Sequence, residues 1–284
     1  FDEPIVDSSM IPTYLVCELV RKHCTVALGG DGGDELFGGY QHYSRLMWMQ
    51  SKFGVIPHSL RKIAALSANR FLPIGFKGKN WLEGLGTEFG RGLPQIARYF
   101  DAKSRKKLLS AFDGWAPTAE SDWHNRTPDS SDLLQRATRM DFQDYLAEDI
   151  LVKVDRASMA SSLELRSPML DYHLIEFAFG KVPSCEKTST VDRKILLKQL
   201  ASKLLPPDFD IQRKQGFSIP MQQWLRAGSF REMIWDILSS NDCIFNRKAI
   251  EELLRLQDKG YSNGERLFSL ALFELWRKQY AVTL

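Results

Sequence analysis

The sequence has few residues of the kinds that cross-link a fold or bind a metal ion unaided. Its 284 residues include four cysteines and five histidines. The cysteines follow no zinc or redox spacing, and the histidines form no ligand pair at helical spacing. This scarcity argues against a disulfide scaffold or a zinc module. It predicts free, buried thiols in a reducing cytoplasm for Cys17, Cys24, Cys185 and Cys243.

Long apolar runs and a strong net charge are absent as well. No segment has the length and polarity of a membrane span, and residues 1–4 lack the basic start and apolar core of a signal peptide. The net charge of +3 is modest for this length, so it neither favours nor opposes a phosphate-bearing ligand. We therefore expect no membrane partner and no nucleic-acid partner. The chain begins without methionine inside an apparently folded region, which predicts a piece of a longer protein.

Glycine and carboxylate side chains are instead concentrated in one loop. Three acidic residues lie among six glycines in residues 29–40, which read Gly-Gly-Asp-Gly-Gly-Asp-Glu-Leu-Phe-Gly-Gly-Tyr. The apolar run Val26-Ala27-Leu28 before them predicts a buried strand. An amphipathic helix is expected over residues 12–22. Its apolar side would consist of Tyr14, Leu15, Leu19 and Val20.

The loop combines groups that suit a phosphate substrate and a cation. Glycines let backbone N–H groups approach a ligand closely, and such groups can hold phosphate oxygens. Asp31, Asp34 and Glu35 would repel the phosphate unless a cation lay between them, and carboxylate oxygens favour Mg²⁺. The alternative is a glycine-rich surface turn with solvated acids, which glycine content alone would favour.

Helical periodicity dominates the rest of the chain. Helices are expected within residues 41–70 with an interruption at Pro57, within 133–180, and over 193–205, 220–226, 230–239, 247–258 and 264–280. Irregular loops that join short helices are expected over 73–97, and another loop is expected over 115–132. Strand signals are few outside residues 24–28, so we expect a mainly helical body joined to the edge of an α/β sheet.

A second group of charged residues lies on the helix expected after residue 145. Asp149, Lys153 and Arg156 share one face, and an acid four residues before a lysine is the favourable order. The opposite face is apolar at Leu146, Ile150, Val154 and Ala157. Pro168 ends this segment, and Asp171 is the expected N-cap of a helix over 172–179. A solvated face with ion pairs remains the alternative for each charged residue.

A third element is the loop over residues 212–220. Arg213 and Lys214 lie beside Gly216, where flexible cations could reach phosphate or a charged intermediate. Ser218 could cap the helix that follows, with Pro220 in its first turn. Two cations on a loop are also commonly just solvated surface.

Taken together and in order, the three elements resemble the synthetase domain of the glutamine-hydrolysing asparagine synthetase family. The family pattern has a Ser-Gly-(Glu/Asp)-Gly-x-Asp-Glu loop followed by Phe-Gly-Gly-Tyr. It continues with a helix like residues 149–159, a Glu-x-Arg-x-Pro-x-Leu-Asp segment like 164–171, an Arg-Lys-x-Gly-Phe loop like 213–217, and a C-terminal helix around Leu275-Trp276. The resemblance covers nearly the whole chain, more loosely over residues 45–130.

The resemblance implies a fold. It predicts a mainly α chain that forms the helical C-terminal part of an α/β adenine-nucleotide-hydrolase-like domain (PP-loop ATP pyrophosphatase). Only the edge of that domain's parallel sheet would be present. Residues 1–45 would be the residual α/β part and residues 46–284 the mainly helical part.

The resemblance also implies a reaction, with ATP and Mg²⁺ as cofactors. The side-chain carboxylate of aspartate would attack the α-phosphate of ATP, and ammonia would then displace AMP from the aspartyl-adenylate. Asp34 would contact Mg²⁺ and pyrophosphate, and the backbone of Gly29 and Gly30 would lie against the adenylate. Asp31 would accept a proton from ammonia or orient the intermediate, while Lys214 would stabilise the adenylate and the leaving groups.

The sequence departs from the family pattern in two ways. Gly29 stands where the family usually has serine, and the pyrophosphate-binding Ser-Gly-Gly-x-Asp-Ser loop does not occur. The glutaminase domain with its cysteine nucleophile is also missing; in relatives both lie upstream of the part that this chain resembles. We therefore expect that these residues alone do not complete the reaction. Aspartate and ATP would be the substrates, a glutaminase domain outside this chain would supply ammonia, and a homodimer is a possible assembly.

Two other interpretations stay open. Relatives with the same chemistry amidate sugars or peptides, or close β-lactam or lasso rings. A non-catalytic helical scaffold is the alternative from another class, which the missing loop favours. A dinucleotide-binding fold is not supported, because the third glycine of that fingerprint is absent at the required step.

Overall fold

The chain is mainly helical, as the sequence predicts. The computed structural model describes residues 2–110, 118–211, 216 and 219–283. In its first half the helices are α1 (Met10–Arg21), α2 (Gly33–Phe37), α3 (Gln41–Phe53), α4 (His58–Phe71), α5 (Lys79–Gly84), α6 (Ala102–Leu108), α7 (Ala119–Arg126) and α8 (Leu133–Asp141). After η1 (Phe142–Ile150) come α9 (Leu151–Ala160), η2 (Pro168–Leu170), α10 (Tyr172–Gly180), α11 (Ser184–Lys187), α12 (Ile195–Leu204), α13 (Met221–Trp224), α14 (Ser229–Ser239), α15 (Arg247–Asp258) and α16 (Gly264–Gln279).

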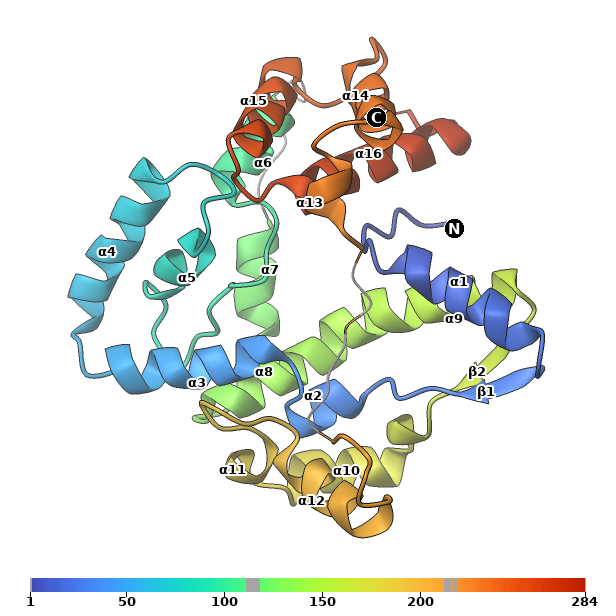
Figure 1. Cartoon of the computed structure of the whole chain (residues 1–284). Helices are drawn as coiled ribbons and strands as arrows, with labels where there is room; N and C mark the ends of the chain where they lie inside the picture. The colour runs from blue at the N-terminus through green and yellow to red at the C-terminus, as the bar shows by residue number, and fades with distance from the viewer. Residues whose placement is uncertain (1, 111–117, 212–215, 217–218, 284) are drawn as a thin grey trace.

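A small parallel sheet lies at one side of the molecule (Figure 1). Strand β1 (Val26–Leu28) pairs with β2 (Glu164–Arg166), and Ala27 lies opposite Leu165. The strand predicted at 26–28 is confirmed, but its predicted burial is wrong: Val26 and Leu28 are 42% and 74% exposed. Two strands pair here in the described chain, and the packed elements leave the outward side chains of β1 open. No strand signal marks β2, because Glu-Leu-Arg contains a single apolar residue.

Helix α1 lies beside the sheet and packs against α9 (Figure 1). The predicted helix is confirmed, and its buried residue is Cys17. Its expected apolar side is largely exposed, since Tyr14, Leu15 and Leu19 are 41%, 56% and 57% accessible. The side of α1 that packs contains Cys17 and is not the predicted apolar side, because the tertiary arrangement decides which face another element covers.

A long helical segment crosses the molecule and links its parts (Figure 1). It runs through α8, η1 and α9, and the middle portion is a π-helix. Asp132 caps its start by accepting hydrogen bonds from the backbone N–H groups of Leu134 and Gln135. Leu146 and Ala157 on the predicted apolar face are buried. A π-helix widens the turn and shifts the side-chain register, so residues after it face directions that a regular 3.6-residue period does not give.

Three apolar clusters hold the helices together. One joins α13–α16 at the top of Figure 1, another joins α3, α5 and α8, and the third joins α2 to α10 and α12 below. In the third cluster Leu36 and Phe37 of α2 are almost fully buried beside Ala178 and Val182. The glycine-rich loop is therefore anchored at its C-terminal side by two large core residues.

One loop prediction is wrong. Residues 119–126, expected within a loop, form α7. Trp123 Nε1 donates to the carbonyl of Leu93 at 2.9 Å, and Glu120 pairs with Arg105. Because no residue of α7 is buried, the segment lacks the apolar period that would have revealed a helix. The predicted N-cap at Asp171 is confirmed, since its carboxylate accepts from the backbone N–H of His173 at 2.9 Å.

The four thiols are free, as predicted, but their predicted burial holds only in part. Cys17 is buried and Cys243 is half-buried, whereas Cys24 and Cys185 are exposed. Separately, none of the helices in the described ranges is both long enough and apolar enough to span a bilayer.

Candidate functional site

The glycine-rich loop begins at the carboxyl ends of both strands. The backbone N–H of Gly29 donates to the carbonyl of Arg166 at 2.7 Å, which continues the β1–β2 pairing by one residue. One step further, the Ser167 hydroxyl donates to Asp31 Oδ2 at 3.2 Å. In open α/β sheets, ligands bind outside the carboxyl ends of the parallel strands. Gly29, Gly30 and Asp31 therefore lie at the edge of the sheet where a ligand site is expected.

Asp34 lies in the first turn of α2 and faces a lysine from a distant part of the chain. Lys194 Nζ is 3.0 Å from Asp34 Oδ1, and both side chains are partly exposed. Lys194 precedes α12 and has φ 53°, a left-handed conformation that is uncommon for a non-glycine residue. This pair places a carboxylate and an ammonium group side by side at the solvent-facing end of the loop.

Gly39 allows this close approach. A Cβ at Gly39 would lie 1.7 Å from Asp34 Oδ1 and 2.3 Å from Lys194 Cε, so no other residue fits without displacing the pair. Gly38 beside it has φ 68°, and its carbonyl accepts a hydrogen bond from the Thr188 hydroxyl. The Gly-Gly pair before Tyr40 thus positions the acidic loop against the segment that carries Lys194.

The third carboxylate of the loop points into the core. Glu35 is 1% exposed and accepts a hydrogen bond from the Tyr40 hydroxyl at 2.5 Å. Burial raises the pKa of Glu35, and the hydrogen bond from Tyr40 opposes that rise. Desolvation, together with the charge of Glu35, likewise raises the pKa of Tyr40 far above its ordinary value. This pair stabilises the loop from within, so Asp31 and Asp34 are the two acids left to face a ligand.

A cavity of about 730 Å³ adjoins the loop at Tyr40. Aromatic side chains from four segments line it together with charged groups of both signs, including Tyr40, His42, Tyr99, Trp123, Tyr145 and Arg126. The His42 and Tyr43 side chains both bond to Asp141 Oδ2, at 2.8 and 2.7 Å. These contacts fix one wall of the cavity to the end of α8, within the long helix.

The charged residues of the long helix form ion pairs with the N-terminal segment, and one of them is buried, so this face is not simply solvated. Lys153 is buried, and its Nζ lies 2.5 Å from Asp7 Oδ2 and 2.8 Å from the Ser9 hydroxyl. It pairs with this N-terminal segment and not with Asp149, the partner that i,i+4 spacing suggested. Arg156 bonds to Asp2 at 2.8 Å. The helix therefore fixes the start of the chain through ion pairs between distant residues.

Asp149 is a partly buried carboxylate on the same helix that these ion pairs do not include. Its Oδ1 atom is buried and has no hydrogen-bond partner within the described residues. Burial, followed by the charge of Asp7, raises the pKa of Asp149 to about 6, although nearby Lys153 acts in the opposite direction. A carboxyl group that titrates near neutral pH is a feature of functional sites and of buried ionic networks alike.

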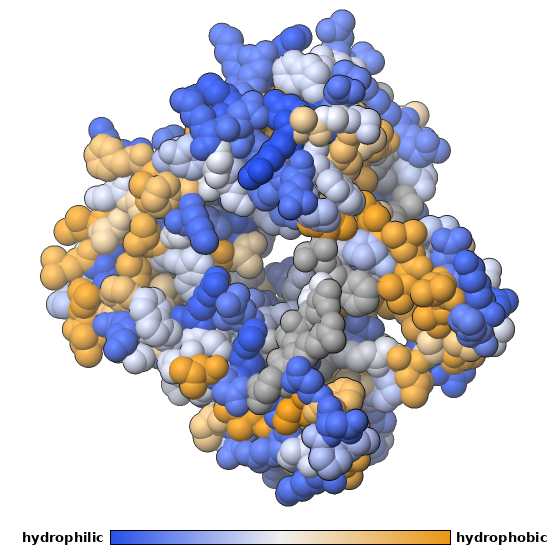
Figure 2. Space-filling view, in the orientation of Figure 1, coloured by the Kyte–Doolittle hydropathy of each residue, from blue (hydrophilic) through white to orange (hydrophobic). Residues whose placement is uncertain are grey.

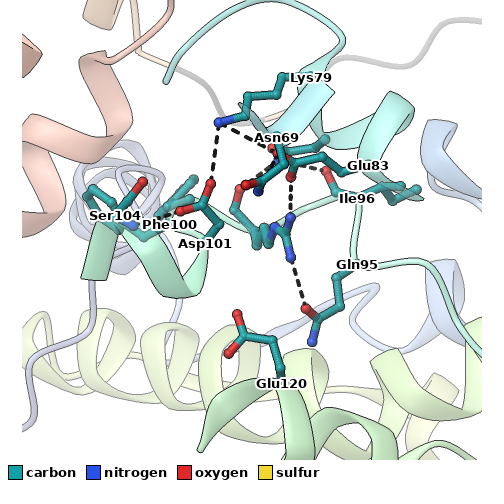
Figure 3. Close-up of polar contacts among 12 residues, drawn as sticks. Asn69, Lys79, Glu83, Gln95, Ile96, Phe100, Asp101, Ser104 and Glu120 are labelled. Atoms are coloured by element: carbon teal, nitrogen blue, oxygen red, sulfur yellow. Dashed lines mark hydrogen bonds and ion pairs between the residues drawn. The ribbon is translucent and has the colours of Figure 1, made fainter. Parts of the chain in front are cut away.

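Charged residues also form a network away from the loop (Figure 3). Lys79 Nζ is 3.3 Å from Asp101 Oδ2 and 3.6 Å from Glu83 Oε1. Glu83 also pairs with Arg98 and accepts a hydrogen bond from Asn69 Nδ2 at 3.0 Å. These residues come from α4, α5 and the segment leading to α6. Because every charge in the network has an opposite partner, its role is to join these elements.

The charged residues of the predicted third element are not among those that the structure describes. Arg213, Lys214 and Ser218 lie outside the described residues. Sequence reasoning also missed Lys194 and Ser167, which the structure brings to Asp34 and Asp31. Ser167 could have been noticed as the residue after a second strand, had β2 been recognised. Lys194 had no local signal beyond being one of several cations before a helix.

The donor set at the loop suits a cation that a substrate helps to hold. No group of three or more histidine, cysteine, aspartate or glutamate side chains gathers around a common point in the described part of the chain. Mg²⁺ is usually bound through one or two carboxylates, with substrate phosphates and water completing its octahedral shell. Asp34, with Asp31 on the same loop, matches that partial set.

The family model described as asparagine synthase matches residues 1–278. A Bacillus subtilis (strain 168) protein, asparagine synthetase [glutamine-hydrolyzing] 1, is 31% identical over 282 residues, covering 97% of this chain and 44% of the relative. A putative asparagine synthetase [glutamine-hydrolyzing] of Mycobacterium tuberculosis (strain H37Rv) is 30% identical over 279 residues, covering 97% and 42%. The chain thus spans less than half the length of these curated relatives.

Proposed function

Since the chain belongs to the asparagine synthase family, we propose that it works as part of a longer enzyme that makes an amide at the expense of ATP. The product would be asparagine, formed from aspartate with ammonia derived from glutamine. The conclusion depends most on one observation, the placement of Asp31 and Asp34 on a glycine loop at the carboxyl edge of a parallel strand pair.

The proposed reaction has two steps. An oxygen of the aspartate side-chain carboxylate attacks the α-phosphorus of ATP, and the bond to the pyrophosphate group breaks. The nitrogen of ammonia then attacks the acyl carbon of the aspartyl-adenylate, AMP leaves, and the surplus proton passes to a base. Charge develops on phosphate oxygens in the first step and on nitrogen in the second, so the site needs cations and a carboxylate.

The residues of the loop are assigned roles that suit these demands. Asp31 would take the proton from the attacking ammonia or orient the intermediate, with the Ser167 hydroxyl fixing one carboxylate oxygen. The backbone of Gly29 and Gly30 would lie against the adenylate. A Cβ at Gly30 would meet no atom within 4 Å, so this side of the loop leaves room for a ligand.

Asp34 would hold Mg²⁺, which when bound would neutralise charge on the departing pyrophosphate. Lys194 shares this carboxylate, so we assign it a second role as a cation at the phosphate end of the site. Lys214 would stabilise the adenylate and the leaving groups from the loop that it occupies in the sequence.

The proposed longer enzyme would supply what this chain lacks. The pyrophosphate-binding loop, the remaining strands of a PP-loop-type sheet and the glutaminase domain would come from further sequence. Leu28 of β1 is 74% exposed, which leaves room for a further element of the longer enzyme to pack on this face of the strand pair. A cytoplasmic location belongs to the same proposal and is consistent with four free thiols.

The first test is nucleotide binding to the chain with and without Mg²⁺, measured by titration calorimetry. We expect affinity that depends on Mg²⁺ and falls at least about tenfold in Asp34→Asn, because the variant keeps the shape of the side chain and removes its charge. Asp208→Asn, at an exposed acid far along the sequence, is the matched control. A nucleotide affinity that changes neither with Mg²⁺ nor in Asp34→Asn would favour the scaffold alternative.

The second test is pyrophosphate release from ATP and aspartate. We expect no robust turnover by these 284 residues alone, because the loop that grips pyrophosphate in relatives is absent from the sequence. Steady release by the purified chain would refute the proposal that it is incomplete. Replacing aspartate by amino sugars or peptides in the same assay, with the longer enzyme, would separate asparagine synthesis from other amidations.

A further inference from the structure

Helix α4 presents its large apolar side chains to solvent. Leu60, Ile63 and Leu66 are 57%, 60% and 62% exposed, and they are the large aliphatic residues of the helix. Val55 before the helix and Phe71 at its end are exposed as well. In Figure 2 an apolar patch covers the side of the molecule where Figure 1 places α4. We call these five residues the α4 face.

The inward side of α4 consists of small and polar residues. Ala65 and Ala68 are buried, and a Cβ at Gly86 would lie 2.9 Å from the Cβ of Ala65, which shows how closely the helix packs. Arg61 is also buried; its guanidinium donates to the carbonyls of Leu85 and Thr87, both at 2.9 Å. These contacts fix the rotation of the helix. The α4 face therefore cannot turn inward without leaving a buried guanidinium unsatisfied.

The stretch of sequence that contains α4 carries charge of one sign. Residues 36–82 contain seven lysine or arginine residues and no aspartate or glutamate. At the overall frequency of 35 acids in 284 residues, a stretch of this length would contain about six. Lys52, Lys62, Arg70 and Lys77 of this stretch are exposed. An apolar face bordered by cations matches the composition of helices that lie in the interface of an anionic membrane.

We propose that the α4 face docks on an anionic phospholipid surface. Leu60, Ile63, Leu66 and Phe71 would enter the boundary between headgroups and acyl chains, and the exposed cations would lie among the lipid phosphates. The helix would lie in the plane of the membrane and would not cross it. This proposal goes beyond amide synthesis and revises our expectation that the chain has no membrane partner.

Charge complementarity favours a lipid surface over a second copy of the chain. In a symmetric pair built on α4, Lys62 and Arg70 of each copy would face a helix that contains no acidic residue, and like charges would oppose association. An anionic bilayer supplies the missing negative charge along the whole face. The face also lies on the side of the molecule opposite the open edge of β1, so completion of the sheet would leave it uncovered (Figure 1).

The test is co-sedimentation of the chain with vesicles. Vesicles of phosphatidylglycerol mixed with phosphatidylcholine should bind the chain, binding should weaken as salt is raised, and pure phosphatidylcholine should bind far less. Removing two cations in Lys62→Gln/Arg70→Gln should weaken binding about thirtyfold, since each cation near an anionic surface contributes about a fivefold factor. Ile63→Ser/Leu66→Ser should weaken it at least about tenfold.

The matched control changes two equally exposed leucines elsewhere. Leu15 and Leu19 of α1 are 56% and 57% exposed, so Leu15→Ser/Leu19→Ser removes similar apolar surface without touching the α4 face. It should bind vesicles as the parent chain does, and circular dichroism should show that each variant keeps its helices. Absence of binding to the anionic vesicles, equal binding to neutral ones, or equal loss in the control would overturn the proposal. So would a dimer, seen by sedimentation velocity without lipid, that Ile63→Ser/Leu66→Ser dissociates, because a second copy would then be the occupant.

Discussion

Replacing Asp149 by asparagine should stabilise the chain at neutral pH. The pKa of Asp149 is about 6, against an ordinary value of 3.8, because the carboxyl is removed from water and lies near the charge of Asp7. A raised carboxyl pKa means that the ionised form is disfavoured in the folded state. The free energy of unfolding therefore falls as pH rises from about 4 to about 6 and stays lower above that range. Asparagine cannot ionise, so it removes this loss.

The size of the effect follows from the pKa. About two pKa units correspond to about 3 kcal/mol, and partial access to solvent reduces the expected gain to about 2 kcal/mol. Lys153 stays paired with Asp7, so the variant breaks no ion pair. The buried Oδ1 atom accepts no hydrogen bond within the described residues, so the substitution sacrifices none there.

The assay is urea unfolding followed by circular dichroism at pH 4 and at pH 8. Asp149→Asn should exceed the parent chain by about 2 kcal/mol at pH 8 and should lie much closer to it at pH 4, where the parent carboxyl is protonated in the folded state and partly protonated in the unfolded state. Asp155→Asn, at an exposed position on the same helix, serves as the control and should change stability little. A variant that is no more stable at pH 8, or that differs equally at both pH values, would refute the reasoning.

Two further predictions concern other contacts. Gly39→Ala should lower Mg²⁺-dependent nucleotide affinity at least about tenfold in calorimetry, because the new Cβ would lie 1.7 Å from Asp34 Oδ1 and would displace Lys194. Gly180→Ala is the control: a Cβ there would meet no atom within 4 Å, so the nucleotide affinity should stay unchanged. Lys187→Met should raise the free energy of unfolding by about 2 kcal/mol at pH 6 and by progressively less above pH 8. Burial lowers the pKa of Lys187 to about 8, so its charged form is penalised in the folded state at lower pH; a gain that persists unchanged at pH 10 would contradict this cause.

Local sequence was a good guide wherever a segment's own residues contain the signal. The helix over 247–258 matches α15 at both ends, because its apolar residues recur at helical spacing. Asp171 was recognised as an N-cap since it stands between a proline-ended segment and an apolar helix. The glycine-rich loop was identified as a candidate site for the same reason, with its glycines and acids contiguous in sequence.

Contacts between distant residues escaped prediction. Val26 of β1 pairs with Glu164 of β2, which lies 138 positions further along the chain. The residues of neither segment indicate which other segment it pairs with. The same holds for Lys194 at Asp34 and for Lys153 at Asp7. The spacing rule suggested Asp149 as the partner of Lys153, but the N-terminal segment supplies another carboxylate to the same ammonium group.

Three features follow from the order of the amino acids alone: the helical character of the chain, the acidic glycine loop and the family resemblance. Each depends on residues that are neighbours or that recur in order. The tertiary structure alone decided which of the three loop acids faces the core, which cation meets Asp34, and which apolar faces stay open on α1 and α4. Periodicity states that a helix has an apolar side. Whether that side is buried depends on the position of every other element, and a single segment contains no information about it.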